Sequence, residues 1–394
     1  MMTVAALEGT VAIDVSGHVA GPYAGSLLGD LGCEVIKVEL PGEGDTHRGR
    51  NPKYEGYGPS FRALNRNKKS LTLNLREKKG REVLLKLLEK ADILIENFRP
   101  QTRKRLGLDY ADLSKLNPRL IHCSISGYGQ SGPYRDKPGF DTISQALSGM
   151  LSLITDLDDP KVAGVSITDH SSGIFAAHGI LAALLARQKT GRGQFVDVSL
   201  LQVSLAFIES HVADYLNGGE AISRENFPMG RIYCFVASDR QPLVIHLSGH
   251  QEAWEGLVRV AGRTDLLADP RFATYKSRTE HHYQIVAILE DEFRNQPRAY
   301  WLERLDANGI PNAPIYKIQE VFDDPQIKHM GIPRQIHHPK MGTTNLIGNP
   351  VNLSDTPAQF FRPAPLLGEN TEEILARFGY DKEAIKELRF GGVI

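Results

Sequence analysis

Short apolar runs alternate with helical patterns along most of this chain, and this alternation constrains the fold more than any other feature. Six runs have the length and composition of buried strands, at residues 11–15, 34–38, 70–75, 93–96, 120–125 and 195–199. Helical patterns lie between several of them, at residues 22–31, 77–90 and 171–189. Strands that alternate with helices form doubly wound, mostly parallel sheets. We therefore expect an α/β fold with a Rossmann-like sheet.

The pattern of predicted secondary structure changes after the glycine pair at residues 218 and 219. Beyond it we expect a hairpin at residues 233–247, followed by a helical region that extends to about residue 321. A proline-spaced return crossing is expected at residues 333–365, and two closing helices at residues 371–378 and 382–388. A chain of 394 residues is long enough for more than one lobe. We therefore expect a large α/β domain from residues 1–218 and 330–394 and a smaller α+β domain at residues 219–329.

The composition excludes several classes of protein. No basic segment precedes the first acidic residue, so a secretory signal is not expected. The longest clean apolar run, residues 180–186, is far shorter than the roughly 20 residues that a bilayer requires, so no membrane span is expected. The three cysteines (33, 123 and 234) are too far apart for a disulfide framework or a zinc site. We expect a cytoplasmic protein without a metal site, with solvated histidine pairs at 281–282 and 337–338.

The net charge of −1 conceals a strongly basic segment. Residues 48–105 contain 17 lysines and arginines but only 6 acidic residues. The solvated face of the helix at residues 77–90 accounts for part of this surplus. Two clusters flank that helix and could converge on a polyanionic ligand; they are Arg66, Lys68 and Lys69 before it and Arg99, Arg103, Lys104 and Arg105 after it. A nucleic-acid binding module would interleave aromatic residues with these cations, and only Phe98 is so placed, so no nucleic acid is expected.

The first strand-to-helix turn carries glycines at positions 17, 21 and 25. This GxxxGxxxG spacing differs from the GxGxxG spacing that admits a dinucleotide pyrophosphate, so a nicotinamide or flavin site is not expected. Glycines four residues apart instead favour the close packing of a helix against a strand. We expect the turn to serve packing.

Asp169 lies between a short apolar segment and the long helix expected at residues 171–189, which is apolar nearly all round and is therefore expected to be buried. Taken alone, an aspartate at this point is typical of an N-cap. The same position would also place a carboxylate at the mouth of the sheet, beside unpaired N–H groups that could stabilise an oxyanion. Asp169 is thus either a cap or a carboxylate nucleophile.

Six motifs in order give the chain its resemblance to a known family. They are AGPYAG (20–25), GCEVIKVE (32–39), NRNKKS (65–70), ENFRP (96–100), GYGQSGP (127–133) and TGRGQ (190–194). On these motifs the chain resembles the class III CoA-transferases, which include formyl-CoA transferase, carnitine CoA-transferase and succinyl-CoA:dicarboxylate CoA-transferases, and to which α-methylacyl-CoA racemase is related. The resemblance covers nearly the whole chain.

The resemblance implies a site and a mechanism. Asp169, in the stretch 167–173, matches the family's acyl-accepting aspartate, which attacks a thioester and passes through a mixed anhydride and an aspartyl-CoA thioester. Coenzyme A would be a co-substrate, with no resident cofactor, and Arg76, Arg99 and Arg105 would be its phosphate partners. The other CoA-binding residues implied by the resemblance are Val19, Ala20, Leu73, Asn74, Asn97, Phe98, Gly139 and Phe140. The implied partners are an acyl-CoA such as succinyl-CoA, a free carboxylic acid and a second copy of the chain in an interlocked homodimer.

One alternative remains within the same superfamily. A 2-methylacyl-CoA racemase uses a histidine and an aspartate to exchange an α-proton, and its histidine lies in a Gly-His-Asp triplet where this chain has Gly139-Phe140-Asp141. Phenylalanine cannot shuttle a proton, which disfavours racemisation. Oxalate is a less expected acceptor, because Val19 stands where formyl-CoA transferase has glutamine and residues 231–249 lack its glycine-rich loop. The stretch 165–173 is more similar to members that act on dicarboxylates such as succinate or glutarate.

Overall fold

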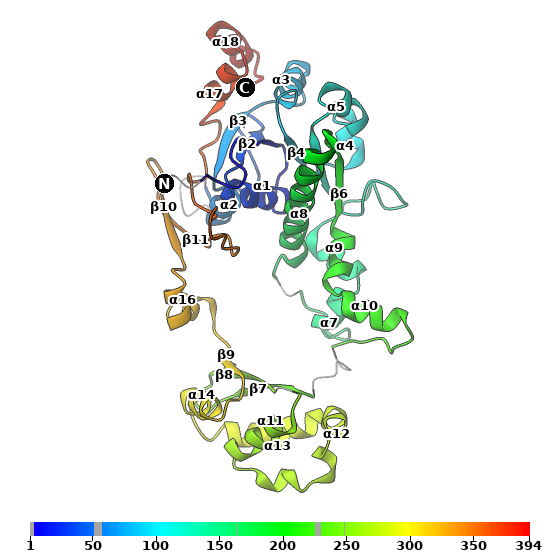
Figure 1. Cartoon of the computed structure of the whole chain (residues 1–394), viewed down its shortest axis with the longest axis vertical. Helices are drawn as coiled ribbons and strands as arrows, with labels where there is room; N and C mark the ends of the chain where they lie inside the picture. The colour runs from blue at the N-terminus through cyan, green and yellow to red at the C-terminus, as the bar shows by residue number, and fades with distance from the viewer. Residues whose placement is uncertain (1–3, 51–56, 163, 225–229, 248) are drawn as a thin grey trace. The chain divides into compact units, whose positions relative to one another are not determined.

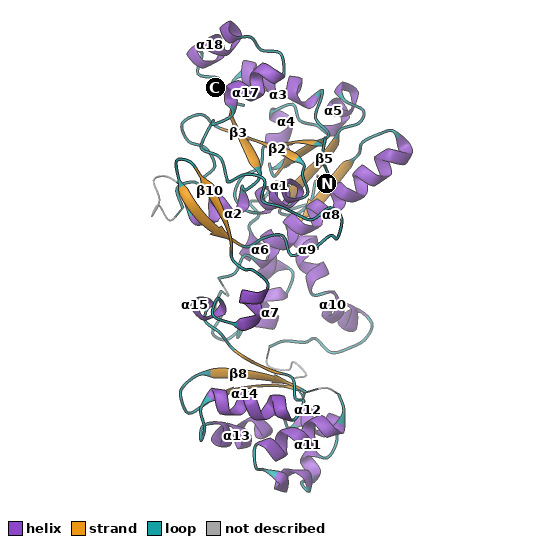
Figure 2. Cartoon of the chain, turned by 60° about the vertical axis from the view of Figure 1, so that its left-hand side comes forward, coloured by secondary structure: helices purple, strands orange, loops and turns teal. Residues whose placement is uncertain are grey.

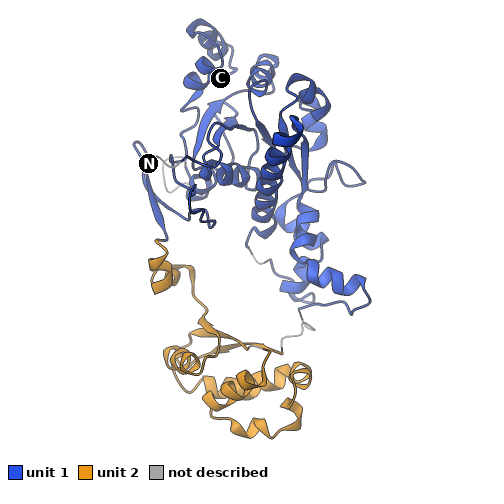
Figure 3. Ribbon diagram, viewed as in Figure 1, with its two compact units in different colours: residues 1–224, 332–394 blue, residues 225–331 orange. Residues whose placement is uncertain are grey.

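The protein was analysed as a computed structural model, which describes residues 4–50, 57–162, 164–224, 230–247 and 249–394. The chain forms two compact units, which Figure 3 colours separately. The first combines residues 1–224 with residues 332–394, so both ends of the chain contribute to it. The second is residues 225–331. The candidate site described below lies within the first unit.

A six-stranded sheet, in which every strand pairs in parallel with its neighbours, forms the centre of the first unit (Figures 1 and 2). Its strands are β1 (Val11–Asp14), β2 (Glu34–Glu39), β3 (Lys68–Thr72), β4 (Ile93–Glu96), β5 (Ile121–Ser126) and β6 (Phe195–Ser199). The strand order is β3-β2-β1-β4-β5-β6. The order therefore reverses between β1 and β4, the position at which open parallel sheets bind ligands. The predicted α/β sheet is confirmed.

Helices cover both faces of the sheet. Successive strand residues point to opposite sides, so each strand contributes side chains to both helical layers. Ala12 of β1 packs in the core with α1 (Ala20–Asp30), α8 (Ile167–Thr190) and α9 (Leu200–Phe207). Its neighbour Ile13 packs on the other face, in the core formed by α3 (Lys78–Leu88), α5 (Tyr110–Leu116), α17 (Thr371–Arg377) and α18 (Lys382–Phe390). The C-terminal helices thus complete a layer that the N-terminal half begins.

Shorter elements surround this sheet. They are α2 (Pro59–Leu64), α4 (Pro100–Arg105), α6 (Asp141–Leu147), α7 (Met150–Ile154), α10 (Glu209–Leu216) and the antiparallel pair β10 (Arg334–His338) and β11 (Gly342–Leu346). The apolar stretch 200–216 forms two helices, α9 and α10, because the backbone turns at Ile208. The segment expected only to cross back contains the β10–β11 hairpin.

The glycines of α1 permit the close packing that their spacing predicts. A Cβ atom at Gly21 would lie 2.2 Å from the Ser16 hydroxyl oxygen, and one at Gly25 would lie 3.1 Å from Lys68 Nζ. A real Cβ atom does not approach another heavy atom as closely as 2.2 Å, so Gly21 accepts no side chain without movement of the β1 loop. The packing interpretation of the GxxxG spacing is confirmed at Gly21.

The long helix differs from its prediction in two ways. It begins at Ile167 with Ser166 as N-cap, so Asp169 lies in its first turn and the N-cap interpretation of Asp169 is wrong. The helix is also not buried all round within this chain, because the side chains of Ile174, Phe175 and Leu185 are exposed. A sequence pattern shows that a surface is apolar but does not show which chain covers it.

Most cations of the predicted anion-binding clusters are neutralised inside the fold. Arg66 pairs with Asp30 at 2.6 Å, and the wholly buried Lys68 pairs with Asp14 at 2.8 Å. Lys69 contacts Glu34 and Glu373, and Arg103 lies near Glu96 and Asp109. The expectation that the whole of both clusters converges on a ligand is therefore wrong, because sequence-distant carboxylates supply their counter-charges.

The second unit is an antiparallel sheet covered by helices. Strands β7 (Ile232–Val236), β8 (Pro242–His246) and β9 (Asn312–Pro314) pair in that order, which confirms the predicted hairpin. Its helices are α11 (Gln251–Val260), α12 (Tyr275–Glu280), α13 (His282–Phe293), α14 (Arg298–Ala307), α15 (Ile318–Val321) and α16 (Pro325–His329), with short 3-10 helices at Thr264–Leu267 and Pro270–Phe272.

The two histidine pairs are not both solvated. His282 is buried and stacks on Tyr233 with ring centroids 5.3 Å apart, and His338 is buried and accepts the N–H of Lys340 at 3.0 Å. The expectation of solvated pairs is wrong for these two residues, because neighbouring positions on one element face opposite environments. In the parts of the chain that the structure describes, no helix combines the length and the apolarity needed to cross a membrane.

Candidate active site

Two adjoining pockets lie at the carboxyl ends of the central strands. One, called here the Arg76 pocket, is lined by the residues that follow β1, β2 and β3 and by α4. The other, called the Asp169 pocket, is lined by the residues that follow β1, β2, β4 and β5 and by the start of α8. His18, Asn97 and Phe98 line both pockets. One extended ligand could therefore occupy both.

The structure brings nearly all of the sequence-predicted site residues to these pockets. Those in the Asp169 pocket are Val19, Ala20, Asn97, Phe98, Arg99, Gly139, Phe140 and Asp169 itself. Those in the Arg76 pocket are Leu73, Arg76, Asn97, Phe98 and Arg105. Asn74 lines neither pocket: its side-chain oxygen accepts the backbone N–H of Arg76 at 3.1 Å, so it holds the turn that carries Arg76.

Asp169 is held beside a second carboxylate. Its backbone N–H donates to Asp141 Oδ1 at 2.9 Å, and the Gln145 side chain donates to Asp141 Oδ2 at 2.6 Å. Burial raises the pKa of the Asp169 carboxyl to about 6, and the charge of Asp141 acts in the same direction, against the smaller opposing effect of His170. The carboxyl is therefore mostly ionised at pH 7 but more basic than an ordinary aspartate.

The Asp169 carboxylate is not engaged by hydrogen-bond donors from the described residues. The backbone N–H of Asp169 is taken by Asp141 and that of His170 by the Ser166 carbonyl oxygen, at 3.3 Å. The expectation of unpaired N–H groups beside Asp169 is therefore wrong for these two donors. The helix start orients the carboxylate but does not offer those groups as an oxyanion hole.

The loop after β1 is clamped to the loop after β4. Asn97 uses its whole amide for this, accepting the Gly17 N–H at 3.0 Å and donating to the Gly17 carbonyl oxygen at 2.8 Å. His18 follows with a φ of 65°, a left-handed conformation that costs a non-glycine residue about 1 kcal/mol or more. Asn97 thus positions the wall between the two pockets rather than presenting its side chain to a ligand.

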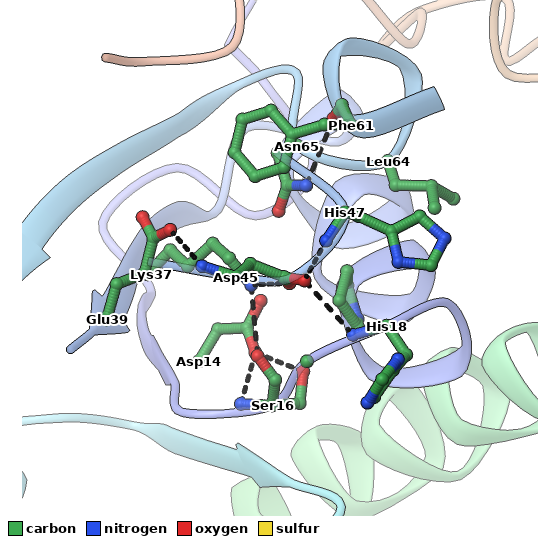
Figure 4. A network of polar contacts seen from close by, with 12 residues as sticks. Asp14, Ser16, His18, Lys37, Glu39, Asp45, His47, Phe61, Leu64 and Asn65 are labelled. Atoms are coloured by element: carbon green, nitrogen blue, oxygen red, sulfur yellow. Dashed lines mark hydrogen bonds and ion pairs between the residues drawn. The ribbon is translucent and has the colours of Figure 1, made fainter. Parts of the chain in front are cut away.

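A buried network of charges holds the same wall from behind (Figure 4). Asp45 accepts the backbone N–H groups of His47 at 2.9 Å and His18 at 3.4 Å, and it pairs with Lys37 at 3.0 Å. Lys37 also donates to the Ser16 carbonyl oxygen at 3.0 Å. Burial alone would raise the pKa of Asp45, but the charge of Lys37 and the His47 N–H outweigh it and lower the pKa to about 2.

A glycine is required at position 139 because two segments of the backbone come into close contact there. A Cβ atom at Gly139 would lie 2.6 Å from the Cα atom of Gly127, in the loop after β5. This approach places Phe140 and Asp141 at the start of α6, with the Phe140 ring exposed. The phenylalanine side chain at position 140 cannot transfer a proton. The α-proton exchange of a racemase requires a histidine and an aspartate, so it lacks one of its two groups here.

Sequence reasoning missed several residues of the Asp169 pocket: His18, His47, Arg50, Arg135, Lys137 and, as a neighbour of Asp169, Asp141. Asp141 had a local signal, since it follows Gly139-Phe140 in the implied CoA-binding stretch. His47 and Arg50 had none, because only the fold carries the loop after β2 to α8. Within the described residues, no group of three or more histidine, cysteine, aspartate or glutamate side chains could hold a metal ion.

Comparisons with known proteins agree on one family. The model of the family described as CoA-transferase family III matches residues 7–371. The chain is 35% identical to mouse succinyl-CoA:glutarate CoA-transferase, over 98% of this chain and 90% of that protein. It is 36% identical to the acetyl-CoA:oxalate CoA-transferase of Acetobacter aceti, over 94% and 95% of the two chains. A crystal structure of a CAIB/BAIF family protein from Brucella suis superposes with a TM-score of 0.84, at 33% identity, covering 94% of this chain and 99% of that one.

Proposed function

Since the chain belongs to CoA-transferase family III and is an enzyme that transfers coenzyme A, we propose that Asp169 is its covalent nucleophile. The observation that carries this proposal is the Asp169 carboxylate itself, which is ionised, basic and without a hydrogen-bond donor among the described residues. A carboxylate suffices as the nucleophile because a thioester is already activated and the attacking group has no proton to lose. Asp141 keeps this carboxylate basic and oriented.

The reaction follows in four balanced steps. Asp169 attacks the donor thioester carbonyl, so that a mixed anhydride forms and CoA leaves as a thiolate. The thiolate attacks the aspartyl carbonyl of the anhydride, which releases the donor acid and leaves an aspartyl-CoA thioester. The acceptor carboxylate attacks that thioester and forms a second anhydride with loss of thiolate. The thiolate then attacks the acceptor carbonyl, which yields the new acyl-CoA and restores Asp169.

Coenzyme A is proposed to extend from the Arg76 pocket into the Asp169 pocket, with its thioester end at Asp169. Arg76 and Arg105 would bind its phosphates in the Arg76 pocket, and Arg99 lines the Asp169 pocket. Among the described residues, none of these three guanidinium groups has a carboxylate partner. Guanidinium groups without counter-ions suit the 3′-phosphate and diphosphate of CoA.

The donor is proposed to be succinyl-CoA and the acceptor a dicarboxylic acid. This proposal draws on relatives whose names specify succinyl-CoA with glutarate, and also acetyl-CoA with oxalate. Glutarate and oxalate both carry two carboxyl groups, so the names agree on the class of acid and not on its length.

The enzyme is proposed to act as a homodimer in the cytoplasm. Exposed apolar side chains on the neighbouring helices α8 and α9, including Ile174, Phe175, Leu185 and Phe207, support a partner subunit, because large exposed apolar side chains gathered on neighbouring elements are typical of interfaces. The three cysteines are unpaired, which suits a reducing compartment.

Trapping the intermediate tests the proposal. The protein is mixed with succinyl-CoA, quenched with acid and mapped by peptide mass spectrometry. A succinyl or CoA adduct is expected on Asp169; Asp169→Ala should carry none, and Asp158→Ala, which alters an exposed loop aspartate, should keep it. An adduct on another residue, or CoA transfer by Asp169→Ala at the wild-type rate, would refute the covalent role.

The CoA path is tested by matched arginine and lysine variants. Arg105→Gln is expected to weaken CoA binding about ten-fold or more, since a charge-assisted contact contributes about 1.5–3 kcal/mol. The control Lys79→Gln removes an exposed cation of α3 that lines neither pocket and should leave CoA affinity unchanged. Equal affinities of both variants, measured by calorimetry, would place the phosphates elsewhere.

A further inference from the structure

We propose that Arg50, held by His47, forms a subsite for the second carboxylate of a dicarboxylic acyl group in the Asp169 pocket, outside the Arg76 pocket to which the CoA phosphates are assigned. This inference rests on the proposed function, because it assumes that the acyl group is carried at Asp169. It assigns the choice between dicarboxylic and monocarboxylic acids to two residues of the loop after β2. Both residues line the Asp169 pocket.

The other cations of this pocket already have partners. Arg135 pairs with Asp136 at 3.1 Å, and Lys137 lies over the Tyr134 ring at 3.7 Å from its centre. Arg99 is assigned to CoA. Arg50 has no carboxylate partner among the described residues, and its one contact is from Nη1 to His47 Nε2, at 3.2 Å. Among the described residues, Arg50 is therefore the cation of this pocket that has neither a carboxylate nor an aromatic partner and is not assigned to CoA.

His47 holds this cation in place through a neutral ring. It is only 5% exposed, and burial lowers its pKa, with the charge of Arg50 acting in the same direction against Asp45. A neutral ring can accept the Arg50 N–H at Nε2, which orients the guanidinium group. A carboxylate bound to this oriented guanidinium group would supply the counter-charge that Arg50 lacks among the described residues.

The subsite is built before any ligand arrives. Asp45 fixes the His47 backbone, as Figure 4 shows, and the neighbouring Arg48 makes two 2.6 Å hydrogen bonds to Glu39. The Arg48 guanidinium also lies 4.0 Å from the centre of the Phe61 ring. These contacts hold residues 45–48 rigid, so little conformational entropy is lost when the loop binds an anion.

The chemistry of the two substrates separates this subsite from the CoA site. All phosphates of an acyl-CoA are on the CoA side of the thioester, and the acyl side is uncharged unless the acid has a second carboxyl group. A cation on the acyl side of Asp169 therefore has no role toward a monocarboxylic acyl group. A site built to bind a polar substrate group rejects the analogue that lacks it by large factors.

The test compares glutarate with valerate, which has the same chain length but one carboxyl group. In a ping-pong reaction kcat/KM for the acceptor reports only the second half-reaction, so effects of a variant on the donor cancel. The wild type is expected to prefer glutarate by about 100-fold or more. Arg50→Gln should reduce kcat/KM for glutarate by about 100-fold and that for valerate by less than three-fold, and Arg50→Lys should keep an intermediate preference.

Controls make the outcomes distinct. Arg135→Gln removes a cation of the same pocket that is already paired and should leave the glutarate preference intact. Unchanged CoA binding shows that Arg50→Gln is folded. An equal loss for both acids, or a wild type that uses valerate as well as glutarate, would overturn the subsite. Failure of the proposed function is a different result: the wild type would then transfer CoA to no acid and carry no adduct on Asp169.

Discussion

The Asp169 carboxylate is expected to cost the protein stability, and Asp169→Asn should therefore be more stable than the wild type at neutral pH. The pKa of this carboxyl is raised from an ordinary 3.8 to about 6, first by burial and then by Asp141. A raised carboxyl pKa means that the folded state disfavours the charged form. The penalty is complete above pH 6 and disappears as the pH falls through the window from 6 to 3.8.

The size of the effect follows from the shift. About two pKa units at about 1.4 kcal/mol each correspond to at most about 3 kcal/mol of unfolding free energy at pH 7. The same linkage leaves about 1.5 kcal/mol at pH 5 and well under 1 kcal/mol at pH 4. Asparagine keeps the shape of the side chain and carries no charge at any of these pH values, so it escapes the penalty.

Urea unfolding at pH 7, 5 and 4 measures the difference directly. The gain of Asp169→Asn over the wild type should be largest at pH 7 and should shrink with acid, while activity is lost throughout. Asp158→Asn, at an exposed loop position, is the matched control and should show no such trend. A gain that does not change with pH, or a variant less stable than the wild type at pH 7, would refute the electrostatic reasoning.

Three further predictions concern Asp141, Gly139 and the buried pair of Lys68 with Asp14. Asp141→Asn keeps the oxygen that accepts the Asp169 N–H but removes the charge that raises the pKa of Asp169, so the acid limb of the kcat/KM profile should move to lower pH. Gly139→Ala would place a methyl group 2.6 Å from Gly127 Cα and should lower activity at least ten-fold, with circular dichroism unchanged. Lys68→Met leaves Asp14 buried without its 2.8 Å partner and should cost about 3–5 kcal/mol in urea unfolding, part of which Asp14→Asn in the same chain restores.

Local patterns were enough to predict the elements that form the sheet. The bounds of β4 (Ile93–Glu96) and β6 (Phe195–Ser199) are those read from the sequence, and the other four strands differ by a few residues. The four central strands, β1, β2, β4 and β5, are buried on both faces, so they read as short apolar runs between turn residues. The solvated face expected of the helix at residues 77–90 is likewise present in α3, where Lys78, Lys79 and Glu82 are exposed.

Family motifs identified Asp169 as the candidate nucleophile. They did not predict the raised pKa of its carboxyl group. The sequence placed Asp169 before a helix, whereas the structure places it in the first turn of α8, beside Asp141. The two aspartates are 28 residues apart, and no local pattern brings them together. The raised pKa of Asp169 depends on this contact and on burial, which are both properties of the folded chain.

The basic segment shows the same difference between what the sequence determines and what the tertiary structure determines. The sequence determined that residues 48–105 carry a surplus of cations and that motifs of the family lie among them. Only the tertiary structure decided that Arg66 and Lys68 are neutralised by Asp30 and Asp14, while Arg50 lies in the Asp169 pocket without a carboxylate partner among the described residues. The physical reason is that secondary structure follows from neighbours in sequence, whereas the pairing of a charge depends on which sequence-distant carboxylate the packed strands bring within about 4 Å of it.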